Sequence, residues 1–332
     1  MAPFPTYTSS QCRQLYDRIN LPAIHRHDPG DASHEVATGY KTYGTERAVA
    51  YLTALQQAFL LHVPFENLEL HYSHHKIISI DPAVIFDKII TQSTGRGGYC
   101  MENNMLFATF LRSLGFDIYM TGARVSNASQ PTANDEDTEV GFTGFGHQVT
   151  IITLADGGRY LVDVGFGNGG PTRPMLLLDR AECERLPPDQ KARMVYGPRP
   201  GCENAEAAKV WMYERTVPGK EGWLLAYCFP DRVEFTAEDF GVMNHFTSTG
   251  RTSFFTYSVI CSKFFASRDG VIVGHVTLFG DSIKVEKRGE KETVVEFATE
   301  RERVEGLEEW LDVRLSEVQR KEIVGMVSAL PS

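Results

Sequence analysis

Residues 95–102 read GRGGYCME, in which three glycines and an arginine stand directly before a single cysteine. Glycine adopts backbone angles closed to other residues and lets another molecule approach the backbone closely. Apolar residues then recur at four-residue steps as far as Leu114, and Gly115 gives a stop, so a helix is predicted to begin at Cys100. The unpaired N–H groups and the positive dipole end of that helix favour a thiolate. The stretch indicates a nucleophilic cysteine or, equally well from these residues alone, a buried structural one.

The charge balance and the hydropathy exclude several classes of protein. Of 332 residues, 33 are basic and 43 acidic, so the net charge is −10, and no run of Lys and Arg can follow a phosphate backbone. No apolar segment approaches the roughly 20 residues that a membrane helix requires, and residues 1–14 lack the pattern of a secretory signal. The six cysteines are scattered, which favours free thiols over a zinc knuckle or a disulfide framework. The sequence predicts a cytoplasmic protein that binds neither nucleic acid nor a membrane.

Hydrophobic periodicity divides the chain into three parts, and the predicted fold class is α+β. A chain of this length, 42% hydrophobic, is expected to form two or three packed units. Residues 1–118, which carry the cysteine, show apolar residues at helical spacing and predict a helical bundle. Residues 119–232 are β-branched and aromatic runs broken by Gly, Asp and Asn, which predict a β unit. Residues 233–332 mix both patterns and predict an α/β unit.

Individual elements follow from the same patterns. Two stretches are predicted to be irregular: the acidic, polar residues 127–139 and the segment around 168–205, which is rich in Gly, Pro and charge. The predicted helices cover 46–63, 82–92, 236–246 and 303–313, the last of which closes the chain. The helix over 82–92 is expected to bury a stripe of Val84, Ile85, Ile89 and Ile90. The predicted strands cover 117–126, 147–166 with a turn at 155–158, 222–229, 254–262, 271–280 and 293–298.

His147 and Asp163 are the best-placed partners for a thiol nucleophile. His147 follows glycines and precedes a strand, and Asp163 ends the partner strand, where an unpaired buried carboxylate would be costly. With Cys100 they fit the logic in which a base activates the thiol and an acid orients the base. Taken singly, each is better explained as a core histidine or a strand-end carboxylate. A two-residue turn at 156–157 would pair His147 with Phe166, so contact with Asp163 requires a bulge, a twisted edge or a histidine outside the ladder.

Three segments resemble signature sequences of the arylamine N-acetyltransferases of eukaryotic type, fungi included. They are RGGYCME with Cys100, TGFGH ending at His147, and VDVGFG with Asp163. The segments VPFENLEL (63–70) and NHFTSTGRTSFF (244–255) resemble further blocks of the family, so the likeness covers most of the chain in the right order. The resemblance implies a helical first domain, a β-barrel second domain and an α/β lid, with a Cys–His–Asp arrangement like that of cysteine proteases.

The resemblance also implies an activity. Cys100 would be the acyl-accepting nucleophile, His147 its base and Asp163 the orienting carboxylate of an acyl-coenzyme A-dependent N-acyltransferase. This class moves an acetyl, propionyl or malonyl group to arylamines or arylhydrazines by a ping-pong mechanism, in the general setting of xenobiotic detoxification. No cofactor is expected to be bound permanently, and acetyl-CoA or malonyl-CoA would be the co-substrate. The preferred acyl group and the amine stay open, because the segments 127–141 and 168–205 can reshape the cleft.

Further residues take supporting roles by the same resemblance. Thr143 and Gly144 match a Thr-Gly pair that contacts coenzyme A in the family. Thr249 lies in a block that is near the cofactor in relatives. Glu66 and Arg96 match an ion pair that holds the active-site loop, so they are expected to support the site rather than take part in the chemistry.

Two other readings of the sequence compete with this one. A thiol hydrolase or a transglutaminase-like enzyme would use the same three residues with water or a protein amine as acceptor. A catalytically silent binding module would keep the fold alone, although all three residues are present. The cluster HYSHH (71–75) is predicted to be a histidine patch on a surface loop rather than a metal site, so no metal is expected.

Overall fold

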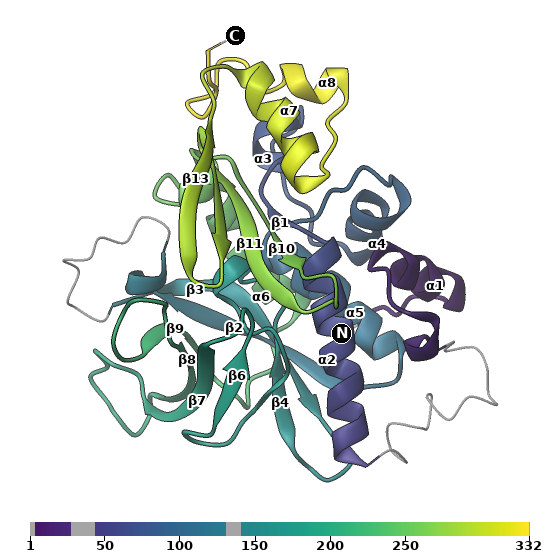
Figure 1. Cartoon of the computed structure of the whole chain (residues 1–332). Helices are drawn as coiled ribbons and strands as arrows, with labels where there is room; N and C mark the ends of the chain where they lie inside the picture. The colour runs from purple at the N-terminus through teal and green to yellow at the C-terminus, as the bar shows by residue number, and fades with distance from the viewer. Residues whose placement is uncertain (1–3, 28–43, 131–140, 332) are drawn as a thin grey trace.

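The computed structural model describes residues 4–27, 44–130 and 141–331, which form two antiparallel sheets with helices around them (Figure 1). The helices of four or more residues are α1 (Ser9–Arg18), α2 (Thr45–His62), α3 (Glu69–Tyr72), α4 (Pro82–Phe86), α5 (Cys100–Ser113), α6 (Ala237–Thr249), α7 (Glu300–Leu311) and α8 (Glu317–Lys321). The strands are β1 (Phe65–Glu66), β2 (Asp117–Ser126), β3 (Phe142–Thr153), β4 (Arg159–Val162), β5 (Met175–Leu176), β6 (Glu182–Arg185), β7 (Gln190–Pro198), β8 (Lys209–Arg215), β9 (Leu224–Phe229), β10 (Ile260–Ala266), β11 (Ile272–Phe279), β12 (Ser282–Lys287) and β13 (Glu290–Glu296). The α+β class is confirmed.

The N-terminal helices pack around α5, whose first twelve residues are all buried. The helix predicted over 46–63 is confirmed as α2, and its apolar residues Leu52, Leu55 and Phe59 are fully buried. The ring of Phe59 meets that of Phe107 on α5 edge to face at 5.2 Å. This apolar core holds the first turn of α5, and with it Cys100, in a fixed position.

The predicted stripe over 82–92 is wrong at one position. Val84 is 52% exposed, whereas Ile85 and Ile89 are buried. Adjacent residues of a helix are about 100° apart, so a face centred on Ile85 and Ile89 leaves Val84 outside it. The helix also ends sooner than predicted, at Phe86, and a π-helical turn over Asp87–Thr91 continues it.

The larger sheet has eight strands in the order β5-β4-β3-β2-β9-β8-β7-β6 and curls into a near-closed barrel below the C-terminal sheet in Figure 1. Inward-facing residues of its long strands form a core of their own, in which Ile151, Met194 and Tyr227 are fully buried. The predicted hairpin at 155–158 joins β3 to β4, with Thr153 paired to Arg159. The β-barrel implied for the second part of the chain is confirmed.

The segment 168–205 is not irregular as predicted, because it supplies β5, β6 and β7. In β7 the residues Ala192 and Met194 face the barrel core, while Lys191 is exposed between buried neighbours. The charged, outward-facing residues and the flanking Gly and Pro hide this alternation in the sequence. Of the other predicted loop, residues 131–140 lie outside the described residues, and Asn127–Ser129 form a 3-10 turn.

The smaller sheet has the order β1-β10-β11-β12-β13, so a strand from the N-terminal part joins the C-terminal sheet. The strand predicted over 254–262 is wrong in its first half, where Phe254–Thr256 form a 3-10 turn and β10 begins only at Ile260. Asn67 imposes this turn: its amide donates to the carbonyls of Phe255 and Ser258, and its Oδ1 accepts from the backbone N–H of Ile260. A distant side chain thus overrides the local β propensity.

Of the last helices, α7 packs against β10 and β11 of the C-terminal sheet, whereas α6 packs against β3 of the barrel. The helix predicted at 236–246 is confirmed as α6, which begins after a capping box at Thr236. The helix predicted at 303–313 begins earlier, after a second capping box at Thr299, and it does not close the chain, because α8 follows. None of the helices in the described ranges has the length and apolarity that crossing a bilayer demands.

Candidate active site

The glycines before Cys100 allow the chain's own carbonyl groups to approach. Gly95 has φ +78°, and a Cβ there would lie 1.8 Å from the carbonyl oxygen of Asp312. A Cβ on Gly97 would lie 1.9 Å from the carbonyl oxygen of Pro64. The expectation that these glycines admit another molecule is therefore wrong for both, since segments far away in the sequence fill the space.

A buried network of ion pairs fixes the loop that precedes Cys100. Arg96 is 3% exposed, and its Nε lies 2.8 Å from Glu66 Oε1, while its Nη2 lies 3.1 Å from Glu69 Oε2. Glu66 is fully buried and also accepts from the backbone N–H of Leu68 at 2.6 Å. The predicted Glu66–Arg96 pair is confirmed as structural, and because Arg96 is engaged with these carboxylates it does not serve the thiol.

Cys100 is the first residue of α5, and neighbouring residues cap the N-terminus of that helix. Glu102 accepts from the backbone N–H of Tyr99, the N-cap residue, and pairs with Lys88. Burial raises the pKa of Glu102 to about 7 and outweighs the lowering by Lys88, while Glu66 raises it further. Cys100 itself is 4% exposed, so its thiol lies at the base of the site rather than on the surface.

The structure brings the predicted acid and base together. His147, on β3, and Asp163, directly after β4, are both buried, and His147 Nε2 lies 2.8 Å from Asp163 Oδ2. The other carboxylate oxygen of Asp163 accepts from Asn104 Nδ2 at 2.9 Å and from the backbone N–H of Gly165 at 2.8 Å. Every oxygen of this buried acid therefore has a partner, which fixes the carboxylate in place.

Two distortions of the sheet make this contact reachable. The β3–β4 ladder ends at the pair Thr150–Val162, so Asp163 has already left it. The register of β3 against β2 shifts beside His147, because Ala123 pairs with His147 but the next residue of β2 pairs with Phe145. Of the three alternatives expected from the sequence, the structure shows two: a bulge, formed against β2, and a histidine that lies outside the β3–β4 ladder.

Electrostatics favour a protonated imidazole. Burial alone would lower the pKa of His147, but the charge of Asp163 and hydrogen bonds to Asp163 and Cys100 raise it to about 10. The same pairing lowers the pKa of Asp163 against the opposing effect of its burial. Because Nε2 is bound to Asp163, Nδ1 is the ring atom left for the sulfur of Cys100. The sulfur also lies 3.5 Å from the carbonyl oxygen of Gly146.

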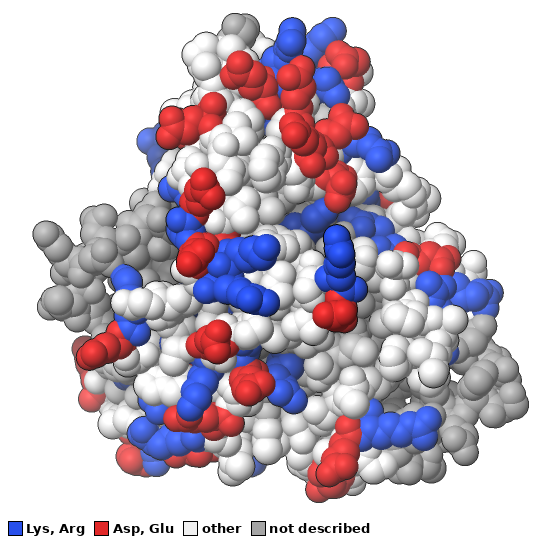
Figure 2. All heavy atoms as spheres, in the orientation of Figure 1, with Lys and Arg blue, Asp and Glu red and all other residues white. Residues whose placement is uncertain are grey.

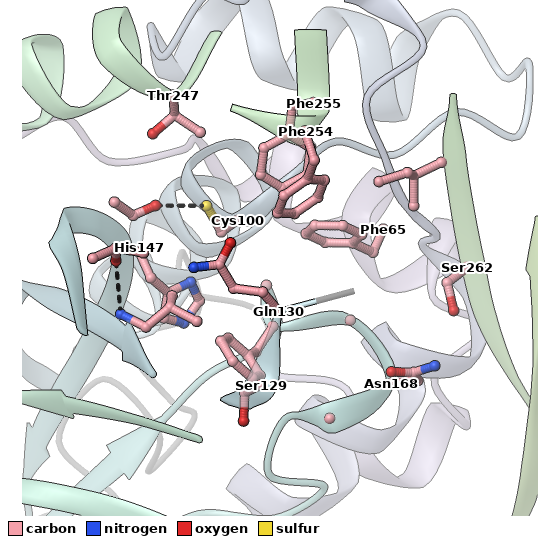
Figure 3. A pocket seen from close by; sticks show the side chains of 18 of the residues that line it. Phe65, Cys100, Ser129, Gln130, His147, Asn168, Thr247, Phe254, Phe255 and Ser262 are labelled. Atoms are coloured by element: carbon pink, nitrogen blue, oxygen red, sulfur yellow. Dashed lines mark hydrogen bonds between the residues drawn. The ribbon is translucent and has the colours of Figure 1, made fainter. Parts of the chain in front are cut away.

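Cys100 and His147 line a cavity of about 700 Å³, and Asp163 contacts the cavity only through His147. In Figure 3 the rings of Phe65, Phe254 and Phe255 gather beside the Cys100 sulfur. The sequence did not assign these aromatic residues to the site. The signal was their position inside two segments that the resemblance singled out, Phe65 in VPFENLEL and the Phe254–Phe255 pair in NHFTSTGRTSFF. An apolar wall beside a nucleophile suits a flat aromatic ligand.

The predicted coenzyme contacts divide into two groups. Thr143 and Gly144 line the cavity, and a Cβ on Gly144 would meet nothing within 4 Å. Thr249 does not line it: its side chain is exposed and donates to the carbonyl of His245 at 2.6 Å. Thr247 lines the cavity instead, and two residues along a helix turn the side chain by about 200°.

The predicted histidine patch is wrong for His71, although His74 and His75 are exposed. His71 lies in the short helix α3, is fully buried, and its Nδ1 lies 2.8 Å from the hydroxyl of Ser328. Burial lowers its pKa to about 4, so the ring is neutral. The C-terminal segment covers this side chain, which the local sequence does not reveal. Within residues 4–27, 44–130 and 141–331, no group of three or more His, Cys, Asp or Glu side chains is placed to hold a metal ion.

Comparison with known proteins agrees with this geometry. Residues 48–320 match the N-acetyltransferase family. The chain is 35% identical over 326 residues to the N-malonyltransferase FDB2 of Gibberella moniliformis, which covers 96% of this chain and 92% of that protein. It is 34% identical to the N-malonyltransferase FDB2 of Fusarium pseudograminearum, over 95% of this chain and 92% of that protein.

Solved structures share the fold. The arylamine N-acetyltransferase of Nocardia farcinica superposes with a TM-score of 0.72 and 25% identity, over 97% of this chain and 96% of that one. The enzyme of Mycobacterium marinum in complex with CoA superposes with a TM-score of 0.70 and 22% identity, over 94% of this chain and 97% of that one. With the family match across most of its length and the Cys–His–Asp geometry in place, the chain belongs to the arylamine N-acetyltransferase family.

Proposed function

We propose that the protein transfers an acetyl or malonyl group from acyl-coenzyme A to the nitrogen of an arylamine or arylhydrazine, through an acyl-thioester on Cys100. The observation that carries the proposal is the chain of contacts from Asp163 through His147 to the Cys100 sulfur, at a cavity large enough for both substrates in turn. Membership of the family gives this arrangement its reaction type.

In the first half-reaction the thiolate of Cys100 attacks the thioester carbonyl carbon. The bond from that carbon to the coenzyme sulfur then breaks, and the imidazolium of His147 gives its Nδ1 proton to the departing thiolate. One thioester replaces another, so the exchange costs little free energy. The high pKa of His147, about 10, supplies the protonated ring that this step needs at neutral pH.

In the second half-reaction the amine attacks the acyl carbon on Cys100. His147, now neutral, takes the proton from the attacking nitrogen, and the Cys100 thiolate leaves as the amide forms. Aromatic amines and hydrazines suit this step because they are unprotonated at neutral pH, whereas an aliphatic amine is mostly ammonium. Phe65 and Phe255, whose rings lie 6.0 Å apart, offer the ring an apolar surface.

Thr143 and Gly144 are proposed to hold the coenzyme in different ways. The hydroxyl of Thr143 accepts from the backbone N–H of Val125 and donates to the carbonyl of Gly144, so it braces the strand. The open space beside Gly144 then lets a ligand lie against the backbone. The position of Thr249 gives no support for a contact with the coenzyme.

Two-substrate kinetics test the proposal. Acetyl-CoA and malonyl-CoA are each varied against aniline, 4-aminobenzoate and phenylhydrazine, with release of free coenzyme thiol as the readout. Parallel double-reciprocal lines are expected, because the acyl-enzyme separates the two half-reactions. A thiol hydrolase would instead release coenzyme at a rate independent of the amine, and that result would contradict N-acyl transfer.

A further inference from the structure

Two arginines at one end of the barrel lie close together without an acidic partner. Arg185, on β6, is 2% exposed and donates to the carbonyls of Asn168 and Gly170 and to the side-chain oxygen of Gln190. All three acceptors are neutral. None of the hydrogen bonds that Arg185 makes among the described residues goes to a carboxylate, so its charge is solvated by dipoles but not neutralised.

Arg215, the last residue of β8, makes fewer hydrogen bonds than Arg185. It is partly buried and lines the cavity that holds Cys100. Its Nε is buried without a hydrogen-bond partner, and among residues 4–27, 44–130 and 141–331 none of its N–H groups has a protein acceptor. Burial, followed by repulsion from Arg185, lowers the pKa of Arg215 to about 10. It is therefore still charged at neutral pH, and an anion would relieve its burial.

The groups around Arg215 do not neutralise it. Glu286 is the acidic side chain of this cavity wall, and its charge raises the pKa of Arg215 against burial and Arg185, but it lies 3.8 Å from His275 Nε2 and makes no ion pair with Arg215. Lys284 and Lys291 line the same cavity and are exposed. Figure 2 shows Lys and Arg side chains gathered at the middle of this face, over the ends of the C-terminal strands above the barrel. Burial first, and then the charges of Arg185, Lys291 and Arg215, lower the pKa of His275 to about 3, so it adds no charge.

A short loop connects this cation to the nucleophile. A Cβ on Gly165 would lie 2.8 Å from the Cα of Cys100, and a Cβ on Gly169 would lie 3.6 Å from Arg215 Nε. The two glycines are four residues apart, so their Cα atoms are separated by at most about 14 Å. This loop therefore links Cys100 and Arg215 along the wall of the cavity that both of them line. Arg185 fixes the same loop through the carbonyls of Asn168 and Gly170.

We propose that Arg215 is a specificity-determining residue that binds a carboxylate carried by one of the substrates. The inference deepens the proposed function and rests on it. A carboxylate accepts two parallel hydrogen bonds from a guanidinium, and Arg215 has its N–H groups free for them. Its binding would offset the repulsion between Arg185 and Arg215, which the charge of Glu286 balances only in part.

Two substrates can bring that carboxylate. One is the acyl donor, if the acyl group is malonyl, whose carboxylate is one methylene beyond the thioester carbonyl. The other is the acceptor, if the arylamine carries a ring carboxylate. The test therefore uses two arms with Arg215→Gln: malonyl-CoA against acetyl-CoA with aniline, and 4-aminobenzoate against aniline with acetyl-CoA. Lys209→Gln, which removes a charge from an exposed position of the same strand β8, is the matched control.

Arg215→Gln is expected to lower kcat/KM about 10- to 100-fold more for the substrate with a carboxylate than for its neutral counterpart, in one of the two arms. The arm that responds identifies the source of the carboxylate. Lys209→Gln is expected to leave both ratios unchanged. Equal losses for charged and neutral substrates in both arms, or no loss at all, would overturn the inference while turnover by the wild-type enzyme upheld the proposed function.

Two measurements do not depend on turnover. Malonate and 4-aminobenzoate are titrated calorimetrically into the wild-type protein and into Arg215→Gln, and at least one is expected to lose about tenfold or more in affinity. The melting temperature of the unliganded variant is expected to equal or exceed that of the wild type, because an unpaired buried charge is removed. Unchanged affinity for both anions, or a destabilised variant, would show that Arg215 serves the fold instead.

Discussion

The loop before Cys100 and one end of the barrel both bury arginines, but among the described residues only the loop arginine, Arg96, forms ion pairs with acidic side chains, whereas Arg185 and Arg215 form none. Arg96 forms ion pairs with Glu66 and Glu69, so its positive charge is balanced by carboxylates of the same chain. Arg185 meets neutral oxygens alone, and Arg215 meets no acceptor among the described residues. The Arg96 network therefore needs no ligand to balance its charge, whereas Arg185 and Arg215 lack a paired anion in the free protein.

The difference separates structural charge from charge that is available to a ligand. A buried ion pair that is fully hydrogen-bonded fixes a loop, and removing one member leaves the other exposed to a large desolvation penalty. A buried cation without a partner costs stability, and the cost falls when an anion binds. The His147–Asp163 pair lies between the two cases, because Asp163 is satisfied by the protein while the other ring nitrogen of His147 faces the nucleophile.

The largest effect is expected when that intermediate pair is broken. Asp163→Asn keeps the shape of the side chain but removes the charge that orients His147 and supports its protonated form. A loss of about 10⁴-fold in kcat/KM is expected in acyl-transfer assays. Asp156→Asn, in the exposed turn between β3 and β4, is the control and should retain full activity. A ten-fold loss or less in Asp163→Asn would show that the histidine does not depend on the acid.

The titration of His147 sharpens the same comparison. With a pKa of about 10 in the folded protein against an ordinary value of 6.5, its stabilising contribution is complete below about pH 6.5 and is lost as the pH rises through about 10. NMR of labelled imidazole should show His147 protonated throughout pH 6 to 8. In Asp163→Asn the effect of burial prevails, and the pKa should fall below 6.5.

His71 is the internal control for that titration, since burial first, and then the charges of Arg303 and Lys76, lower its pKa to about 4, and the substitution does not touch these groups. A His147 that titrates near pH 6.5 in the wild-type protein would contradict the ion pair.

Breaking the closed network should destabilise the fold. Arg96→Met leaves Glu66 buried without its main partner and is expected to lower the free energy of unfolding by about 3–5 kcal/mol in denaturant titrations. Adding Glu66→Gln, which removes the orphaned charge, should restore part of the loss. Arg301→Ala breaks an exposed pair with Glu305 and should cost about 0.5 kcal/mol or less. If Arg96→Met and Arg301→Ala lower the free energy of unfolding by the same amount, the buried Arg96 network contributes no more to stability than an exposed ion pair, which contradicts the comparison.

The smallest expected effect concerns the packing of the cysteine loop. Gly97→Ala places a methyl group against the Pro64 carbonyl, and the backbone must shift at a cost of about 1–3 kcal/mol. Gly241→Ala, inside α6 with open space around it, should instead stabilise the protein by about 0.5–1 kcal/mol. Thermal unfolding of the two variants measures the difference, and a neutral Gly97→Ala would refute the close approach.

The sequence predicted what neighbouring residues determine. The helix α2, the start of α5 at Cys100 and the hairpin between β3 and β4 all follow from spacing and turn residues. The triad was predicted because a nucleophile, a base and an acid each lay at a glycine-rich or strand-end position, and because of the family likeness. The division at 118 and 232 stays a prediction.

Features that depend on distant contacts were missed or wrong. The turn at Phe254–Thr256 is fixed by Asn67, and His71 is buried by the segment that carries Ser328. Arg215 reaches the active-site cavity only because the barrel closes and brings the end of β8 beside Gly169. No local pattern in the sequence predicts these long-range contacts.

The central claim is that Cys100 carries the acyl group, and mass spectrometry of the intact protein tests it most directly. Wild-type protein mixed with acetyl-CoA or malonyl-CoA and quenched in acid should gain the mass of one acyl group, located on the peptide that contains Cys100. Subsequent addition of an arylamine should remove the added mass. Cys202→Ser should behave like the wild type and Cys100→Ser should stay unmodified. A wild-type protein that gains no mass from either donor, while iodoacetamide still alkylates Cys100, would contradict the account.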